Sequence, residues 1–234
     1  DAFLSRATKT ADFRGTDAHP ARMWQAASQL AAADLFVDDL HKTLSAHTER
    51  TDGRVHGVFT ETDTGQRAAA AHGRRAVGTK GSDRLVTVSS MKFDYSEATR
   101  EAVFLGDVHA QTASGQAQGN RAVIFLNAPT KSERPAASAL GGSVEKIVLS
   151  GGVRISEPGR TATGEQMLYR AANQEFVLTG SPGHLPRISD EKQGNITGAT
   201  LLFGAADSTI VVAGEPGAHG QARGRVHTET VVKP

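Results

Sequence analysis

The feature that most constrains this chain is an alternation of apolar and polar residues from Val144 to Ser156. Its odd positions Ile147, Leu149, Val153 and Ile155 are apolar, and its even positions Lys146, Ser150, Arg154 and Ser156 are polar, with Val148 the exception. A period of two residues places alternate side chains on opposite faces of a β-strand. Gly151 and Gly152 interrupt the run, and glycines within a strand are typical of a bulge or a bend. The segment therefore predicts one long, curved strand with a single apolar face.

Short apolar runs bounded by turn residues continue toward the C-terminus. They are Met167–Tyr169, Glu175–Thr179, Thr200–Phe203, Thr209–Ala213 and Arg225–Val232. Glycine accounts for 25 of the 234 residues, which suits tight turns because glycine adopts positive φ without a steric penalty. Two stretches, Glu61–Asp83 and Asn127–Ser143, have the composition of connections. This organisation predicts an all-β fold of at least ten strands with little helix.

Three hairpin-like units align with one another without gaps. Each has a short strand, a polar turn and a second strand, which is the pattern of a β-hairpin. The paired segments are 35–38 with 42–46, 93–96 with 100–104, and 167–170 with 174–178. Gly106 and Gly180 each follow the second strand of their unit. The repeat predicts stacked antiparallel hairpins that share a continuous core, and a chance likeness between ordinary hairpins is the alternative.

The stretch from Pro20 to Ser45 has two interpretations. Its many alanines, the spacing of its apolar residues and Pro20 near a first turn also match a helix. The first hairpin unit overlaps this stretch, and we therefore predict strands there.

Charge and cysteine content exclude several classes of protein. The chain carries 26 basic and 25 acidic side chains, with no concentrated basic face of the kind that neutralises nucleic-acid phosphates. It has no cysteine, which excludes disulfides, thiolate catalysis and cysteine-based metal sites. No apolar run approaches the ~20 residues that a membrane-spanning helix needs.

The residues of a catalytic site are not recognisable in the sequence. The nine histidines are scattered, and there is neither a zincin motif, a phosphate-binding glycine loop nor a nucleophile elbow. His41 and His47 lie near Asp38 and Asp39, but aspartates in turns and histidines on surfaces are ordinary. We predict no catalytic residue, no metal site and no cofactor.

Several runs share a pattern of apolar alternation punctuated by glycine, over residues 102–110, 119–122, 144–155, 162–169, 176–182, 194–203, 209–216 and 225–229. In this pattern the chain resembles the OstA-like family, which contains the periplasmic lipopolysaccharide-transport proteins LptA and LptC and the N-terminal domain of LptD. The resemblance extends over Val86–Glu229 and more loosely over Arg22–Ala46.

The resemblance implies a fold and a function. The fold is a folded-over antiparallel sheet, built of stacked hairpins as an open-ended jelly roll. The function is non-enzymatic, periplasmic binding and bridging of lipopolysaccharide on its way to the outer membrane. Expected partners are lipopolysaccharide, other transport proteins that pair through edge strands, and further copies of the chain arranged head to tail. Residues 1–83 would form a hairpin segment with a connection and 84–234 an OstA-like β domain, unless both form one continuous β structure.

Two opposed apolar faces make either a packed core or a trough for acyl chains, which gain about 0.8 kcal/mol per CH₂ removed from water. The candidate lining residues are Phe93, Tyr95, Phe104, Ile147, Leu149, Val153, Ile155, Met167, Tyr169, Phe176 and Leu178. Arg74 and Arg75 are weaker candidates for binding lipid phosphates, with a solvated loop as the alternative. Two other functions stay open: a ligand-free structural β domain of a larger envelope protein, and a carbohydrate-active β-solenoid or jelly-roll enzyme.

Overall fold

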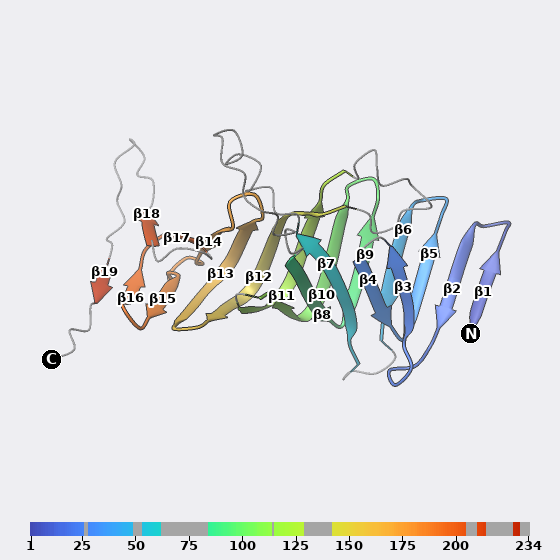
Figure 1. Cartoon of the computed structure of the whole chain (residues 1–234), viewed down its shortest axis with the longest axis horizontal. Helices are drawn as coiled ribbons and strands as arrows, with labels where there is room; N and C mark the ends of the chain where they lie inside the picture. The colour runs from blue at the N-terminus through green and yellow to red at the C-terminus, as the bar shows by residue number, and fades with distance from the viewer. Residues whose placement is uncertain are drawn as a thin grey trace, which may run out of the picture.

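The computed structural model describes residues 1–25, 28–48, 53–61, 84–113, 115–128, 142–204, 210–213 and 227–229. Within these ranges nineteen β-strands form one continuous sheet in which every pairing is antiparallel (Figure 1). The all-β prediction is confirmed, and the part of Pro20–Ser45 that is described consists of strands and turns. In the described ranges no helix is long and apolar enough to cross a membrane.

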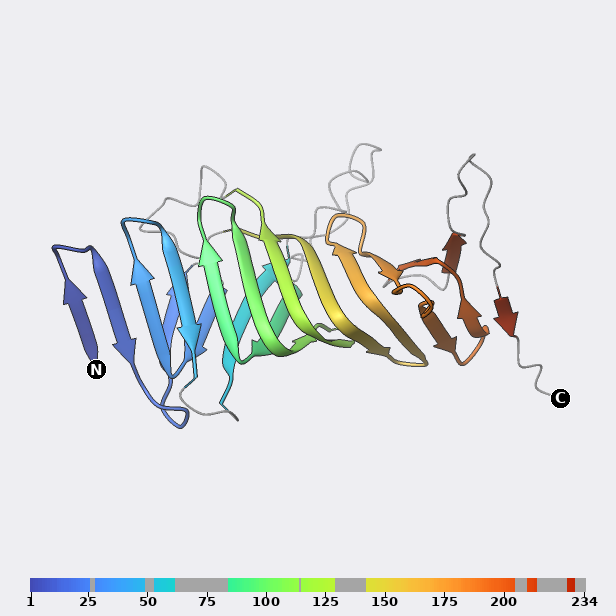
Figure 2. The same ribbon diagram turned by 180° about the vertical axis from the view of Figure 1, so that it is seen from behind.

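The sheet folds back on itself into two layers (Figure 2). Layer one contains β1 (Ala2–Ser5), β2 (Thr10–Arg14), β5 (Asp34–Asp38), β6 (Thr43–His47), β9 (Lys92–Ser96), β14 (Glu175–Thr179), β17 (Thr200–Gly204) and β18 (Ile210–Ala213). Layer two contains β3 (Ala21–Gln25), β4 (Ser28–Ala32), β7 (Val55–Glu61), β8 (Arg84–Ser90), β15 (Arg187–Asp190), β16 (Gly194–Thr197) and β19 (His227–Glu229).

Four long strands belong to both layers, namely β10 (Glu101–Gln111), β11 (Gln116–Leu126), β12 (Val144–Glu157) and β13 (Arg160–Arg170). One half of β10 pairs with β9 of layer one, and its other half pairs with β8 of layer two. In the same way β13 pairs with β14 along one half and with β15 along the other. These four strands therefore join the two layers, and the sheet bends where they cross from one to the other.

The bends of β10 and β12 are β-bulges. The register shifts between Ser150 and Val153 of β12, where Gly151 and Gly152 have φ of +85° and +65°. An extra residue at this point bends the strand and increases its twist. The bulge or bend predicted from the two glycines is therefore confirmed.

The bend of β10 corrects the interpretation of Gly106. The sequence pattern placed Gly106 after the end of a strand, but β10 continues through it to Gln111. Gly106 and Asp107 both have positive φ, and the register of β10 shifts there. Arg54, which precedes β7, donates hydrogen bonds to the carbonyl and the carboxylate of Asp107 and so ties layer two to the bend. The hydrogen bond from Arg54 lowers the pKa of the Asp107 carboxyl.

Cross-strand register lines up the apolar side chains of layer one in two rows along the molecule. The row nearer the bend, the proximal row, contains Phe13, Leu35, Ala46, Phe93, Phe104, Ala122, Leu149, Met167, Leu178, Leu201 and Val212. The distal row contains Ala11, Val37, Leu44, Tyr95, Ala102, Ile124, Ile147, Tyr169, Phe176, Phe203 and Ile210. Both rows face layer two, and together they form one continuous core.

The three predicted hairpin units are β5–β6, β9–β10 and β13–β14. Their four-residue turns all end on a residue with φ near +54°, namely Lys42, Arg100 and Gln174. The hairpin β1–β2 has the same turn, ending at Lys9, and is a unit that the sequence comparison missed. The turns also stack, because the amide of Asp39 donates to the carbonyl of Lys9 and the amide of Glu97 donates to that of Lys42.

The later strands agree with the predictions in position. β14 has the predicted bounds, and β17 and β18 differ from them by one residue at one end. Met167–Tyr169 is only part of the longer β13. Most of the two predicted connections, Glu61–Asp83 and Asn127–Ser143, lies outside the described residues.

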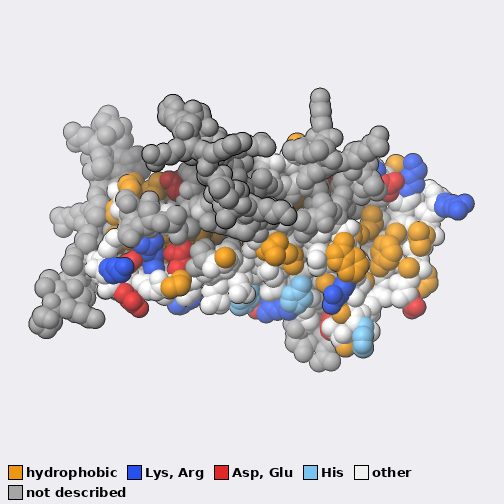
Figure 3. All heavy atoms as spheres, viewed as in Figure 1, with side chains coloured by type: hydrophobic (Ala, Val, Ile, Leu, Met, Phe, Trp, Pro, Cys, Tyr) orange, Lys and Arg blue, Asp and Glu red, His pale blue; other side chains and the backbone are white. Residues whose placement is uncertain are grey.

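The sheet is open at both ends of the molecule. Among the described strands, β1, β3, β18 and β19 each pair with one neighbour only. Hydrophobic side chains gather on the surface toward the end that carries the N-terminus (Figure 3). Phe3 and Leu4 of β1 and Trp24 of β3 are more than half exposed. This end thus combines unpaired backbone edges with apolar side chains.

We expect the two glycines of the β12 bulge to differ in how well they tolerate replacement by alanine. A Cβ at Gly151 would lie 2.8 Å from the Cβ of Asn120, whereas a Cβ at Gly152 would meet nothing within 4 Å. Gly152→Ala should cost about 1 kcal/mol for the left-handed backbone alone, and Gly151→Ala about 2–4 kcal/mol because the clash adds to it. Urea unfolding followed by circular dichroism measures both. An equal loss in the two variants, or the reverse order, would contradict this description of the bulge.

Candidate functional site

Aromatic packing closes the space between the layers toward the N-terminal end. The ring of Phe104 lies 4.9 Å from that of Phe93 and meets that of Phe59, from layer two, edge to face at 5.9 Å. Gly57 of β7 lies so close to layer one that a Cβ there would be 2.8 Å from Cζ of Phe104. The layers are in direct contact in this part of the molecule.

An apolar cavity of about 70 Å³ lies between the layers near the middle of the sheet. Layer two contributes its wall from β8 and from the β10–β11 turn, and the long strands and β14 contribute the rest. The lining residues are Val86, Val88, Ala110, Thr112, Ala113, Gly115, Gln116, Ala117, Ala122, Ile147, Leu149, Ile155, Glu157, Met167, Tyr169 and Phe176.

The structure divides the candidate lining residues into two groups. Six of them line this cavity: Ile147, Leu149, Ile155, Met167, Tyr169 and Phe176. The other five lie in the core but do not line it: Phe93, Tyr95, Phe104, Val153 and Leu178. The weaker phosphate-binding candidates, Arg74 and Arg75, lie outside the described residues.

The cavity is small for an acyl chain. Its volume of about 70 Å³ is roughly half of the ~150 Å³ at which an apolar cavity in a protein admits benzene. A longer chain therefore enters only when side chains rotate or the layers separate. The layers are joined by the four long strands and by short connections such as Ala33 between β4 and β5 and Met91 between β8 and β9, so a separation has to open the side away from these junctions.

Aromatic rings extend the apolar wall from the cavity toward the C-terminal end. The ring of Tyr169 lies 4.8 Å from that of Phe176, which in turn stacks on that of Phe203 at 5.1 Å. These three rings occupy successive positions of the distal row on β13, β14 and β17. They form an apolar surface that faces layer two.

A row of ionic side chains faces these rings from layer two. Glu157 pairs in register with Arg160, and Arg160 pairs with Asp190. Each stands two residues beyond an inward-facing apolar residue of its strand, so all three point between the layers. Their side chains are only about one-tenth exposed, and the Arg160 guanidinium lies 5.8 Å from the centre of the Phe203 ring. We call these three residues the ionic row.

The two carboxylates of the ionic row are held differently. Asp190 accepts a hydrogen bond of 3.0 Å from Nε of Arg160 and two more from the amides of Lys192 and Gln193. Burial raises the pKa of Asp190, but these hydrogen bonds outweigh it and leave the pKa lowered. Glu157 lies 3.8 Å from Nη1 of Arg160, too far for a hydrogen bond, and burial raises its pKa.

The ionic row went unnoticed in the sequence, although half of its signal was visible. Glu157 and Arg160 flank Pro158 and Gly159, and a two-residue turn places its flanking residues opposite each other on the same face. Asp190 lies on β15, which pairs with β13 although β14 stands between these two strands in the sequence.

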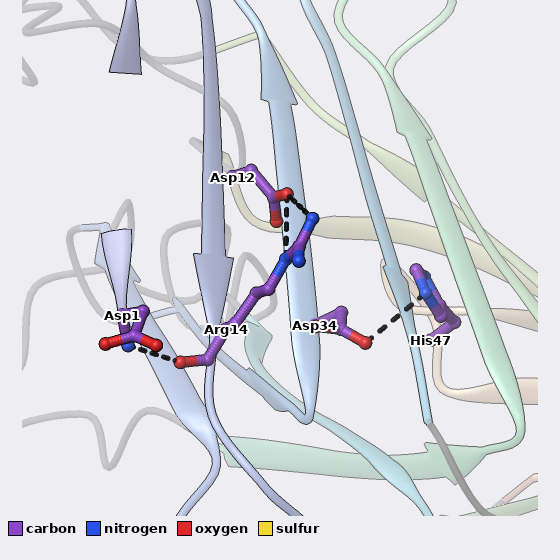
Figure 4. A network of polar contacts seen from close by, with 5 residues as sticks. All are labelled: Asp1, Asp12, Arg14, Asp34 and His47. Carbon is purple, nitrogen blue, oxygen red and sulfur yellow. Dashed lines mark hydrogen bonds and ion pairs between the residues drawn. The ribbon is translucent and has the colours of Figure 1, made fainter. Parts of the chain in front are cut away.

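The histidines near Asp38 and Asp39 do not form a common site. Nδ1 of His41 lies 2.6 Å from the Asp38 carboxylate, within the β5–β6 turn. His47 pairs instead with Asp34 across the other end of the hairpin, at 3.4 Å (Figure 4). In the part of the chain that the structure describes, no three metal-ligating side chains come together.

Comparison with known proteins identifies a family. The model of the family described as "LptA/(LptD N-terminal domain) LPS transport protein" matches residues 87–203. No curated protein matches. Eight solved chains match, including the crystal structure of LptH, the LptA homologous periplasmic component of the conserved lipopolysaccharide transport device from Pseudomonas aeruginosa. LptH is 14% identical with a TM-score of 0.47, and the match covers 64% of this chain and 95% of that chain.

We expect Glu157→Gln to stabilise the protein at neutral pH. The pKa of Glu157 is raised in the folded state, so its ionised form opposes folding as the pH rises from the ordinary value of 4.5 through the raised value. The neutral amide removes that penalty and should raise the Tm by about 2–4 °C near pH 7. The gain should vanish below the ordinary Glu value, where the carboxyl is protonated in both states.

Asp190→Asn is the control of opposite sign. Its carboxylate contributes stability above the ordinary value of 3.8, because its pKa is lowered in the folded state. Thermal unfolding of both variants across this pH range measures the two effects. A loss of stability in Glu157→Gln at neutral pH would show that the Glu157 carboxylate is a favourable partner of Arg160.

Proposed function

We propose that this chain, which belongs to the family of LptA and LptD N-terminal lipopolysaccharide-transport proteins, holds acyl chains of lipopolysaccharide between its two layers. The cavity carries this proposal. All of its lining residues except Val86 lie within 87–203, the segment that matches the family. Its walls come from both layers and are apolar, apart from a few polar residues such as Glu157. An acyl chain leaving water gains about 0.8 kcal/mol per CH₂ in such surroundings.

Holding an acyl chain between the layers needs no chemical reaction. The family consists of transport proteins rather than enzymes. The candidate lining residues bind by burial of apolar surface, without a metal or an organic cofactor. We assign the chain to the periplasm, where its relative LptH is a component of the transport device.

Bridging to other transport proteins would use the open ends of the sheet. Among the strands that the structure describes, β1, β3, β18 and β19 each leave one edge without a neighbour, and such edges are templates for strand addition. Residues 1–83 and 84–234 would act as one continuous β structure, because β6 pairs with β9 and β7 with β8 across this division. Lipid could then pass along one interior from partner to partner.

The proposed binding mode predicts that crosslinking depends on the face of the strand. A photo-reactive leucine or phenylalanine analogue at Leu149, Ile155 or Phe176 should form adducts with lipopolysaccharide in cells, since these residues line the cavity. The same analogues at Lys146 or Arg154 should yield at most about a tenth as much adduct, because those residues alternate with the inward ones. Immunoblotting for lipopolysaccharide on the purified protein measures the yield.

Two outcomes would reject acyl binding between the layers. One is an equal yield from both faces of β12. The other is no adduct from any position in cells where the protein is functional. Either result would favour the alternative of a ligand-free structural β domain.

The free edge of β1 allows a test of bridging. Asp1 and Arg14 exchange two backbone hydrogen bonds of 2.7 and 2.8 Å (Figure 4 shows the first). Hydrogen-bonded pairs alternate along an antiparallel ladder, so Phe3 faces β2 and the amide of Leu4 points to the free edge. Leu4→Pro therefore removes an edge donor without breaking the β1–β2 ladder.

We expect the protein to associate head to tail as its concentration rises, and Leu4→Pro to raise the concentration required by about tenfold. Leu4→Ala is the matched control, because it removes the exposed side chain and keeps the amide. Sedimentation equilibrium of the three proteins measures association. An equal effect of both variants would point to side-chain contact instead of strand pairing. A monomer at every concentration would remove self-association, but would leave acyl binding and pairing with other transport proteins.

A further inference from the structure

The interior of the described sheet is mostly apolar, and the charged side chains of the ionic row are only about one-tenth exposed there, which is costly. Moving charged groups out of water carries a penalty that an ion pair repays only with good geometry and further hydrogen bonds. Arg160 has one such bond, from Nε to Asp190. A guanidinium has five N–H donors, and among the described residues the other four of Arg160 make no hydrogen bond.

Glu157 is unsatisfied in the same way. Its side chain is about nine-tenths buried, and within the described ranges its carboxylate accepts no hydrogen bond. It also lines the cavity, as Tyr169 and Phe176 do. Free donors on Arg160 and a free acceptor on Glu157 thus lie side by side at the edge of an apolar cavity. Buried polar groups without partners are rare in native proteins and call for an explanation.

The charge of the ionic row indicates what kind of group would bind there. One guanidinium stands between two carboxylates, so the row carries no net positive charge that would attract a phosphate. An uncharged group with both an acceptor and a donor suits it better. A carbonyl oxygen would accept from Arg160, and a neighbouring hydroxyl or amide N–H would donate to Glu157.

We propose that Arg160 and Glu157 bind the uncharged polar link at the root of an acyl chain, an ester or amide carbonyl with an adjacent hydroxyl or N–H. The hydrocarbon then lies in the cavity against Tyr169 and Phe176. Asp190 positions Arg160 through the bond to Nε and leaves both terminal nitrogens free for the ligand. The contacts with the ionic row fix how deep the acyl chain lies and in which direction it runs. The apolar walls bind every hydrocarbon chain equally well. This inference rests on the proposed acyl binding and adds its polar contact.

The test compares two probes that differ only in the polar link. Methyl 3-hydroxydecanoate carries an ester carbonyl and a hydroxyl, and undecane carries neither. Calorimetry on the full chain measures the affinity of both. Arg160→Met should weaken binding of the hydroxy ester about tenfold to a hundredfold, the worth of hydrogen bonds to a charged group. Undecane should bind to the variant as it does to the parent.

Three further proteins keep the test decisive. Arg160→Met combined with Asp190→Asn leaves only Glu157 charged, and serves if the single variant does not fold. Arg160→Lys keeps the charge but loses the planar fork, and should bind the hydroxy ester with intermediate affinity. Arg154→Met removes an exposed arginine on the opposite face of β12 and should change neither affinity.

Failure of this inference is distinguishable from failure of the proposed function. If the parent binds undecane, but Arg160→Met binds both probes as the parent does, the ionic row does not contact the ligand and acyl binding stands. If inorganic phosphate displaces the hydroxy ester from the parent, the row binds anions and the charge argument is wrong. If the parent binds neither probe, acyl binding between the layers is itself rejected.

Discussion

The structure depends on burying two apolar faces of one sheet against each other. The proximal and distal rows extend across layer one from β2 to β18, and neither would leave water if the sheet stayed flat. Folding at the bulges of β10 and β12 brings layer two over them. Gly151 and Gly152, together with the Arg54–Asp107 contact at the bend of β10, are therefore central to the fold although they contribute little apolar area.

The same constraint explains why a cavity can exist within a core. Toward the N-terminal end the layers are held together by Phe59, Phe93 and Phe104. Toward the middle, small residues such as Ala110, Ala117 and Ala122 occupy the facing rows, and a cavity remains. Packing density thus changes along one continuous interior. Glu157 of the ionic row lines this cavity, so the proposed polar contact and the proposed acyl site lie at one place.

Much of the fold could be predicted from β12 and the hairpin repeat. Strict alternation assigned Ile147, Leu149, Val153 and Ile155 to one buried face, and all four are at most 5% exposed. The repeat overrode the helical interpretation of the alanine-rich stretch. It missed the β1–β2 hairpin, because that turn shares a backbone conformation with the others and little sequence. Gly106 was misplaced, since a glycine at a bend and a glycine after a strand look the same in a sequence.

By itself the sequence determined which side chains share a face, because that depends only on the period of two residues along each strand. It could not determine which of those faces meet. Six of the candidate residues line the cavity and five are packed into the core, a division set by what lies opposite them in the other layer. The ionic row has the same origin. Glu157 and Arg160 are neighbours through a short turn, but Asp190 and Phe203 join them only when β15 pairs with β13 and the sheet folds over. Pairings between distant strands are chosen by the burial of the whole sheet, and no local pattern carries that information.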